Sequence, residues 1–576
     1  MEDLIDVCLG RVEADLVLEC GALLNVFTGE ILEDVLVAVK GGRIAYVGRK
    51  ANLKAAETLK VKGLTVPGFI DAHTHIDLIC TPTEQAGWML AHGTTSIFTE
   101  PDELASVLGF RGLKIFVEEV RRLPLRVYVL IPLTTPQNPE VSTLNVMPLK
   151  AYREALKWPE VVGLGETVAW PMITSRKKYY MDKFRLALRV GKLIEGHTAG
   201  ARNTKLAACV CSGVSSCHEA VDGEQALERL RLGLFLMIRE GSLRRDLPQI
   251  LPELLSRRVS LENAALVTDW VDPADLLEHG YMDYVVRRAI EYGVDPVRAI
   301  QMVTLNPARH FRLENLIGAV APGRYADLVV LENLENPKVK LTLLGGRVVA
   351  RDEIFLGKLR EPRYPRYSLK TVRVHGKLRP EDFKLKPPVE GRVKAFVAKL
   401  ESEAVTRKTL EEVEAVGGDV RLNGLSKIAV IDRHHGSGRI GLGLVRGFAE
   451  VGAVASTLNF DENQLVVVGC RNEDMARAAN EAVKFGGGIV LVDGGEVLEA
   501  LPMPVAGVIS MVKLKEASEK LKRVNWKLRE AGSRLRKPLN FLFFSTFTTL
   551  PELRFTDRGI LDVKSGRYLN LFPPQT

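Results

Sequence analysis

The sequence predicts an α/β fold: a (β/α)8 barrel of the TIM type with β-rich flanks and a C-terminal α/β or α+β domain. Two observations support this prediction. Short apolar runs, typical of buried strands, alternate with helical segments along the first part of the chain, which favours a parallel sheet. Metal-binding residue types follow five of these runs, and parallel barrels place their chemistry at the C-terminal ends of strands.

The strands of the predicted barrel are separated by enough chain for a helix each, since a βαβ unit takes roughly 25–40 residues. Helices are expected between them, for example over residues 182–190 and 224–232. The expected strands are, in chain order, residues 65–70, 93–99, 126–131, 161–164, 192–195, 213–216, 234–238 and 264–268.

The residues that follow the strands are the ligand types of a two-metal hydrolase. Imidazole and carboxylate groups suit zinc, manganese or iron. The chain has only ten histidines, and four of them belong to this set. Two lie two residues apart at the first strand end, so that their rings share a face. The predicted metal ligands are His73, His75, Glu166, His197, His218 and Asp269.

The order of these residues indicates how two metals would share them. The histidine pair on the first strand can hold one metal, and His197 and His218 can hold a second. Glu166 is placed to bridge the two, and Asp269 can bind a metal while keeping an oxygen free for protons. Two metals about 3.5–4 Å apart can share and activate a hydroxide near neutral pH. Each residue alone would be an ordinary structural group, but six in order at barrel spacing predict a site.

Residues 66–75, Val-Pro-Gly-Phe-Ile-Asp-Ala-His-Thr-His, resemble the first-strand signature of the amidohydrolase superfamily. Further motifs narrow the resemblance to the adenine deaminases, and it covers nearly the whole chain. In that family a glutamate, here Glu166, replaces the carbamylated lysine of many relatives. The other matching motifs lie at residues 163–166, 196–199, 216–219, 238–242, 304–308, 432–435 and 501–507.

The resemblance implies hydrolysis of adenine to hypoxanthine and ammonia by a metal-activated hydroxide, a reaction of purine salvage. It implies two divalent metal ions, with Mn²⁺ as the first choice and Fe²⁺ or Zn²⁺ as alternatives. Asp269 would act as general base and then acid, and Glu219 would be a further catalytic residue that holds the base. The expected substrate-binding residues are Glu103, Arg239, Glu240 and Ser242.

The resemblance also implies a domain organisation. Residues 1–60 and 310–355 would combine into one small β-sandwich beside a barrel of residues 61–309. The proline-rich, charged segment 356–388 is the expected linker. Residues 389–576 would form the adenine-deaminase-type C-terminal domain, and proteins of this family type often pair as homodimers.

Several residues near the ligands depart from the family pattern. Asp102 stands where the family has histidine, and Cys217 and Trp270 stand where it has aspartate. Phe460 and Asn463 lie in a segment that reads His-Asp-Ser-His-Asn in the family. Two alternatives therefore stay open: another cyclic amidine or amide hydrolase of the superfamily, and a catalytically degenerate paralogue.

Composition and charge exclude other classes of function. The N-terminus has no basic, apolar leader, and no apolar run approaches the roughly 20 residues of a membrane span. Seven scattered cysteines indicate reduced thiols and a cytoplasmic location. The net charge is +8, but the segments rich in lysine and arginine are not interleaved with the aromatic residues that a nucleic-acid-binding surface uses to stack on bases. We expect a purine base as partner, with no nucleic acid and no membrane; His434 and His435 could serve the site or an interface.

Overall fold

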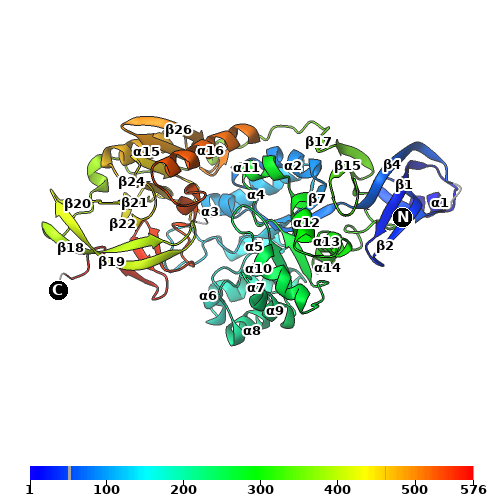
Figure 1. Ribbon diagram of the computed structural model, residues 1–576, viewed down its shortest axis with the longest axis horizontal. Helices are drawn as coiled ribbons and strands as arrows, with labels where there is room; N and C mark the ends of the chain where they lie inside the picture. The colour runs from blue at the N-terminus through cyan, green and yellow to red at the C-terminus, as the bar shows by residue number, and fades with distance from the viewer. Residues whose placement is uncertain (50–52, 461, 575–576) are drawn as a thin grey trace.

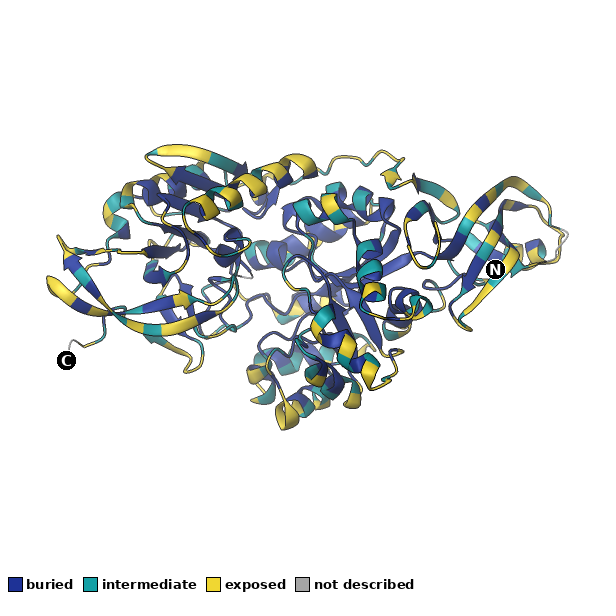
Figure 2. Cartoon of the chain, viewed as in Figure 1, coloured by how far each residue is buried: buried dark blue, intermediate teal, exposed yellow. Residues whose placement is uncertain are grey.

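Three parts of the molecule follow one another along its longest axis (Figure 1). The computed structural model describes residues 1–49, 53–460 and 462–574. The N-terminal sheet lies at one end, the barrel in the middle and the C-terminal domain at the other end. Buried residues occupy the interiors of the barrel and of the C-terminal domain, while exposed ones gather on the outer helices and hairpins (Figure 2).

The barrel consists of eight parallel strands, each close to a predicted one. They form two sheets, β10-β9-β8-β7-β5 and β11-β12-β13. Backbone hydrogen bonds close the barrel, from Asp269 N to His73 O at 3.0 Å and from Ser215 N to Ile194 O at 2.9 Å. The strands are β5 (Phe69–Thr74), β7 (Thr94–Thr99), β8 (Arg126–Ile131), β9 (Val161–Leu164), β10 (Leu193–Ile194), β11 (Ser216–Cys217), β12 (Phe235–Arg239) and β13 (Ala264–Val267).

Amphipathic helices surround the barrel. In α7 (Lys178–Arg189) the buried residues Tyr180, Phe184 and Ala187 recur every three or four positions, which gives the helix one apolar face. The Asp222 side chain accepts from the backbone N–H of Gln225 and so starts α9. The other long barrel helices are α2 (Pro82–Ala91), α4 (Phe110–Val120), α8 (Asn203–Cys211), α9 (Gly223–Arg231), α10 (Leu247–Ser256) and α12 (Met282–Glu291).

The flanks of the barrel pair into one eight-stranded sheet. Strand β4 (Ala55–Pro67) is its centre, parallel to β1 and antiparallel to β14. These pairings continue the sheet to Pro67, past the limit predicted at residue 60, and β5 begins after Gly68. The other strands are β1 (Ala14–Asn25), β2 (Glu30–Lys40), β3 (Arg43–Gly48), β14 (Leu328–Leu331), β15 (Val339–Leu344), β16 (Arg347–Arg351) and β17 (Ile354–Phe355).

The C-terminal domain contains a nine-stranded sheet in the order β20-β19-β18-β22-β21-β24-β23-β25-β26. Helix α15 (Asn472–Lys484) packs its alanine-rich face on this sheet, and α16 (Leu514–Glu530) and α17 (Leu539–Phe544) follow. The strands are β18 (Gly391–Leu400), β19 (Thr406–Val416), β20 (Asp419–Arg421), β21 (Leu425–Ile431), β22 (Ile440–Arg446), β23 (Ala453–Ser456), β24 (Leu465–Gly469), β25 (Gly488–Asp493) and β26 (Glu496–Pro502).

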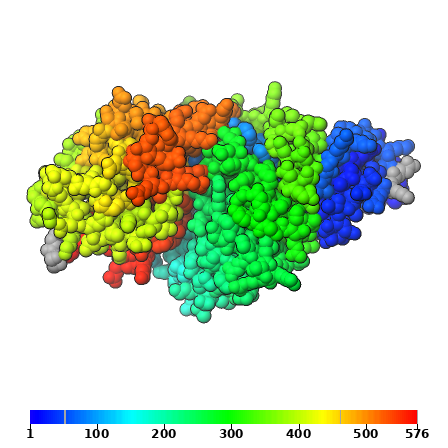
Figure 3. All heavy atoms as spheres, viewed as in Figure 1, coloured from blue at the N-terminus to red at the C-terminus, as the bar shows by residue number. Residues whose placement is uncertain are grey.

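The C-terminal domain lies directly against the barrel (Figure 3). Strand β6 (Ile79–Cys80), in the loop after β5, pairs in parallel with β27 (Ile509–Ser510) of the C-terminal domain. Polar contacts also cross the boundary, such as Ser142 Oγ to Glu462 Oε2 at 2.7 Å. Among the described residues, no helix combines the length and apolar character that a membrane crossing requires.

Candidate metal centre and substrate pocket

The six predicted metal ligands converge at one mouth of the barrel. His73 lies in β5, and the others follow the C-terminal ends of β5, β9, β10, β11 and β13. His73 Nε2 is 3.1 Å from Glu166 Oε1 and 3.2 Å from Asp269 Oδ1. His218 Nε2 is 3.1 Å from His197 Nδ1. Distances of this size between donor atoms are those of groups arranged around a shared cation, as the barrel topology predicts.

Glu166 occupies the centre of the cluster with one oxygen on each side. Its Oε1 is 3.0 Å from His75 Nε2, and its Oε2 is 2.6 Å from His197 Nδ1. The residue before Glu166 is Gly165. Any larger residue would clash there, because a Cβ at position 165 would lie 1.8 Å from Glu100 Oε2. Such a two-sided contact is what a bridging role for Glu166 requires, and the role itself stays a prediction.

Asp269 follows β13 in an uncommon backbone conformation. Its φ is +64°, in the left-handed region, and its N–H bonds the carbonyl of His73. A strained non-glycine residue persists only where the surroundings fix it, and such residues cluster at functional sites. Here the conformation gives the two oxygens different partners: Oδ1 faces His73, and Oδ2 accepts from Arg239 Nη1 at 3.3 Å.

The chemistry of this donor set fits divalent cations. Burial alone raises the pKa of Glu166, but His197 and His218 lower it well below its ordinary value, so that it is ionised. Burial likewise raises the pKa of Asp269, but the contact with His73 lowers it below its ordinary value. Four of the ligands, His73, Glu166, His218 and Asp269, offer atoms that all lie within 4.8 Å of one another. Burial lowers the pKa values of His73 and His197, but the neighbouring carboxylates raise them to about 10 and about 9. Because divalent first-row metals bind the neutral imidazole, a cation would bind these rings by displacing a proton from each.

The outer nitrogen of His75 lies between two oxygens of the segment that follows β7. His75 Nδ1 is 3.2 Å from the backbone carbonyl oxygen of Glu100 and 3.2 Å from Asp102 Oδ2, whereas Glu100 Oε1 is 3.8 Å from His73 Nδ1, beyond hydrogen-bond distance. Carboxylates in this position fix the ring and its tautomer. Asp102, at a position where the family pattern has histidine, therefore orients the ring of His75. Sequence reasoning did not find Glu100, although its place at the end of β7 was the available signal.

A cavity of about 150 Å³ opens beside the metal ligands. One side is polar and comes from the barrel, with His75, Glu166 and Asp269. The other side is apolar and comes mainly from the C-terminal domain. Its described lining residues there are Ala404, Val405, Phe460, Phe544, Phe547 and Leu550. The cavity therefore presents ionised groups to one edge of a ligand and hydrocarbon to its body.

Four of the predicted substrate and catalytic residues line this cavity: Glu103, Glu219, Arg239 and Asp269. Glu219 accepts a hydrogen bond from Arg239 Nη1. Burial raises the pKa of Glu219, but Arg239 and the nearby histidines lower it to about 2, so the group is an acceptor at neutral pH. Glu103 is the opposite case, because burial and Asp77 raise its pKa well above the ordinary value. A protonated carboxyl can donate a hydrogen bond.

Two predicted substrate-binding residues do not reach the cavity. Glu240 follows Arg239 and projects away from it, with its Oε1 3.7 Å from Arg288 Nε. Ser242 Oγ donates to Asp275 Oδ2 at 2.6 Å. The prediction for these two is corrected. Glu240 points to the opposite side from its strand neighbour Arg239, and Ser242 lies in the bend that follows, where it bonds Asp275.

The histidines of the C-terminal domain lie outside the metal cluster. His434 is half-buried, and its Nε2 is 2.9 Å from the carbonyl oxygen of Glu462. His435 is part-exposed beside Asp432. Like Glu462, Asn463 reaches the barrel, where its Nδ2 donates to Glu103 Oε2 and to Ser106 Oγ, the latter at 2.7 Å.

Known proteins match this chain from end to end. The adenine deaminase C-terminal domain matches residues 403–567, and the amidohydrolase family matches residues 64–349. An adenine deaminase of Moorella thermoacetica is 39% identical, over 99% of this chain and 97% of its own. The chain belongs to the adenine deaminase family. Adenine deaminases of Cenarchaeum symbiosum and Rubrobacter xylanophilus are 36% and 38% identical, covering 98% and 96% of this chain and 93% and 94% of their own.

Membership of the adenine deaminase family confirms the predicted family and fold class. The amidohydrolase match contains every barrel strand, and the C-terminal match contains most of the nine-stranded sheet. The buried histidines and carboxylates at the barrel mouth form a divalent metal site of this family. The cavity between the two matched regions is the candidate substrate pocket.

Proposed function

We propose that this protein hydrolyses adenine to hypoxanthine and ammonia. The observation that carries the proposal is the match to adenine deaminases over nearly the whole chain, at up to 39% identity in the relatives described above. The volume of the cavity is also consistent with adenine as the substrate. An apolar cavity of about 150 Å³ holds one flat aromatic ring such as benzene, and the cavity here has the same volume. A free base fits such a space better than a nucleotide.

Two divalent cations, with Mn²⁺ as first choice, are part of the proposal. His73, His75, Glu166 and Asp269 would hold one ion, and Glu166, His197 and His218 the other. The contacts of Glu166 with His75 and with His197 support this division. His218 lies near both groups, because its Nε2 is 3.8 Å from Glu166 Oε1. When bound, such a pair of cations supplies a water nucleophile activated near neutral pH and a Lewis acid.

The residues of the chain would then move protons and orient the base. Asp269 Oδ2 faces the cavity side and can take a proton from the attacking water, then return it to the leaving amine. Glu103 can donate a hydrogen bond to a ring nitrogen. Glu219, held ionised by Arg239, can accept one from a ring N–H. The reaction balances: a C–O bond to water replaces the C–N bond, and the amine leaves as ammonia.

The test is a substrate series on protein reconstituted with Mn²⁺. Adenine, guanine, cytosine and dihydropyrimidines are offered separately, and ammonia release and ring opening are measured. The proposal expects adenine to be the preferred substrate. Preference for another base or a cyclic amide would identify the alternative hydrolase. No turnover by fully metal-loaded protein would indicate the degenerate paralogue.

We also propose that the protein works as a homodimer in the cytoplasm, without nucleic-acid or membrane partners. The family resemblance supports the dimer, and the free cysteines agree with a reducing compartment. Sedimentation of the metal-loaded protein would test the dimer, and a monomer at micromolar concentration would contradict it. Fractionation of cells would test the location.

A further inference from the structure

The apolar side of the pocket is built from three phenyl rings of the C-terminal domain. Phe460 lies between β23 and β24, Phe544 ends α17, and Phe547 follows it. Phe544 meets Phe460 edge to face with ring centroids 5.0 Å apart, and meets Phe547 with centroids 6.3 Å apart. We call these three rings the phenyl wall. Edge-to-face packing fixes the rings relative to one another.

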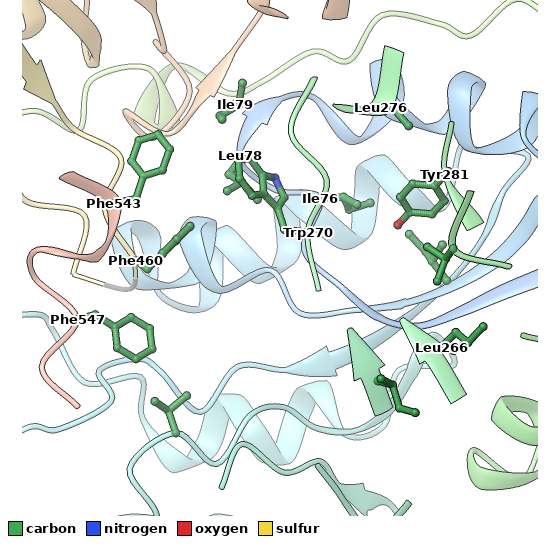
Figure 4. Packing of buried hydrophobic residues seen from close by; sticks show 14 of the residues in the cluster. Ile76, Leu78, Ile79, Leu266, Trp270, Leu276, Tyr281, Phe460, Phe543 and Phe547 are labelled. Atoms are coloured by element: carbon green, nitrogen blue, oxygen red, sulfur yellow. The ribbon is translucent and has the colours of Figure 1, made fainter. Parts of the chain in front are cut away.

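The phenyl wall lies next to the metal ligands. The ring centroid of Phe547 is 6.3 Å from that of His197. Phe460 and Phe547 are 8% and 7% exposed, and both line the cavity. Figure 4 shows them extending from the C-terminal segments towards the barrel side that carries Leu78 and Trp270. A ligand whose reacting edge meets the metal ligands therefore has its body beside these rings.

The position of the wall is fixed by contacts outside the pocket. The backbone N–H of Phe460 donates to the carbonyl of Phe543 at 2.8 Å, which joins the two segments that supply the rings. Asn463 bonds Glu103 and Ser106 of the barrel. The wall is thus held at a set distance from the polar side, as a slot for a flat molecule requires.

We propose that the phenyl wall is the substrate-selecting surface of the site, and that Phe547 and Phe460 stack on the ring of a planar heteroaromatic base. The inference rests on the proposed function and deepens it. The barrel residues meet the polar edge where the reaction occurs, while the C-terminal domain recognises the flat, aromatic body. A π-face is common to all bases, so stacking selects planarity and leaves the choice among bases to Glu103 and Glu219.

The experiment compares Phe547→Leu, Phe547→Tyr and Phe460→Leu, all loaded with metal. Leucine keeps an apolar side chain and removes the ring, whereas tyrosine keeps the ring. We expect the leucine variants to raise KM for adenine about 10-fold to 100-fold, the size of one base–aromatic stack, with kcat changed only a few-fold. Phe547→Tyr should stay within a few-fold of the parent. Metal content should be unchanged in all three.

The matched control is Phe541→Leu. Phe541 is 1% exposed and pairs with Phe448 at a centroid distance of 5.6 Å in the same domain, but it does not line the cavity. It should lower the melting temperature without changing KM. If the leucine variants at 547 and 460 behave like this control, the wall has only a structural role and the inference is overturned.

A binding measurement separates this inference from the proposed function. Calorimetry with hypoxanthine, guanine and cytosine needs no turnover. If the parent does not deaminate adenine, the proposed function fails. The wall is then judged by whether Phe547→Leu weakens, about 10-fold or more, each base that the parent binds. A parent that binds no planar base, or a variant with unchanged affinity, overturns the inference.

Discussion

Arg229 Nε donates a hydrogen bond to Cys217 Sγ at 3.1 Å, and both side chains are fully buried. Arg229 Nη2 also donates to the carbonyl of Thr198 at 2.9 Å. Among the described residues, no carboxylate lies within ion-pair distance of this guanidinium. Thr198 and Cys217 each adjoin a metal-binding histidine, so Arg229 joins the ends of the two strands that deliver the second histidine pair.

The first prediction concerns Arg229. Replacing it with methionine leaves the Thr198 carbonyl and Cys217 without their donor, so His197 and His218 should lose their alignment. Metal affinity should fall about 10-fold to 100-fold, as for other residues that orient metal ligands. Titration with Mn²⁺ measures it. Cys217→Asp, which offers Arg229 a carboxylate, should retain metal; equal affinity in the parent and Arg229→Met would contradict the positioning role.

The second prediction concerns Glu166 as the carboxylate that bridges two metal ions. Reconstituted parent protein should contain about two metal ions per chain, and Glu166→Gln should lose metal readily, because a neutral amide bridges two dications poorly. Elemental analysis after dialysis against a chelator measures both. Glu119→Gln is the control, since Glu119 is a buried carboxylate that accepts from Thr83 and Tyr364 far from the cluster. Full metal retention in Glu166→Gln would exclude it as the bridge.

The third prediction separates the two roles of Asp269. In Asp269→Asn the amide oxygen can still face His73, but the side chain cannot take a proton at neutral pH. We expect kcat to fall by roughly 10²–10⁴-fold with metal content largely kept, the usual contribution of a positioned general base. Both quantities are measured on one preparation. Turnover within a few-fold of the parent would remove Asp269 from the proton path.

The fourth prediction is a pH dependence of stability. Glu462 is buried, its Oε2 accepts from Ser142, and its Oε1 has no hydrogen-bond partner among the described residues. Burial raises the pKa of Glu462 to about 7 from an ordinary value of 4.5. Below pH 4.5 the group is protonated in both states. Between pH 4.5 and 7 the folded state holds more protons, so stability falls as pH rises, by up to about 3 kcal/mol.

Glu462→Gln removes this titration. The variant should match the parent near pH 5 and be more stable above pH 7, because a neutral amide can still accept from Ser142 without carrying a buried charge. Urea unfolding at pH 5 and pH 8 measures the difference. If the free energy of unfolding changed with pH in the same way in the parent and in Glu462→Gln, ionisation of Glu462 would not destabilise the folded protein, which would contradict the prediction.

The barrel and its ligands were predictable because both depend on local patterns. Apolar runs mark the strands, and a ligand directly after a run, such as Glu166 after β9, lies at the barrel mouth by topology alone. The sequence did not predict which side chains at the end of β12 point into the pocket and which point away from it. Arg239 lines the pocket while Glu240 contacts Arg288, and only the exact end of the strand decides which of two neighbours faces inward.

The apolar half of the pocket was beyond sequence reasoning for a different reason. Phe460 and Phe547 are far apart in the chain, and each resembles an ordinary core aromatic. They meet only because β24, α17 and the segment that joins them pack together in the folded domain. No local pattern places Phe547 beside His197. The predicted alternatives about the substrate arose in part from this gap, because Phe460 was one of several changed residues whose surroundings the sequence does not give.

The pairing of β6 with β27 has a consequence for biosynthesis. The ligand-bearing strands leave the ribosome first, but β27 and Phe547 come from the last part of the chain. A nascent barrel therefore has its metal ligands in place while the edge of β6 and the mouth of the pocket are still open. A chain that stops before β27 would lack both the partner strand of β6 and two rings of the phenyl wall, Phe544 and Phe547, so we expect it to capture metal but not to retain a base.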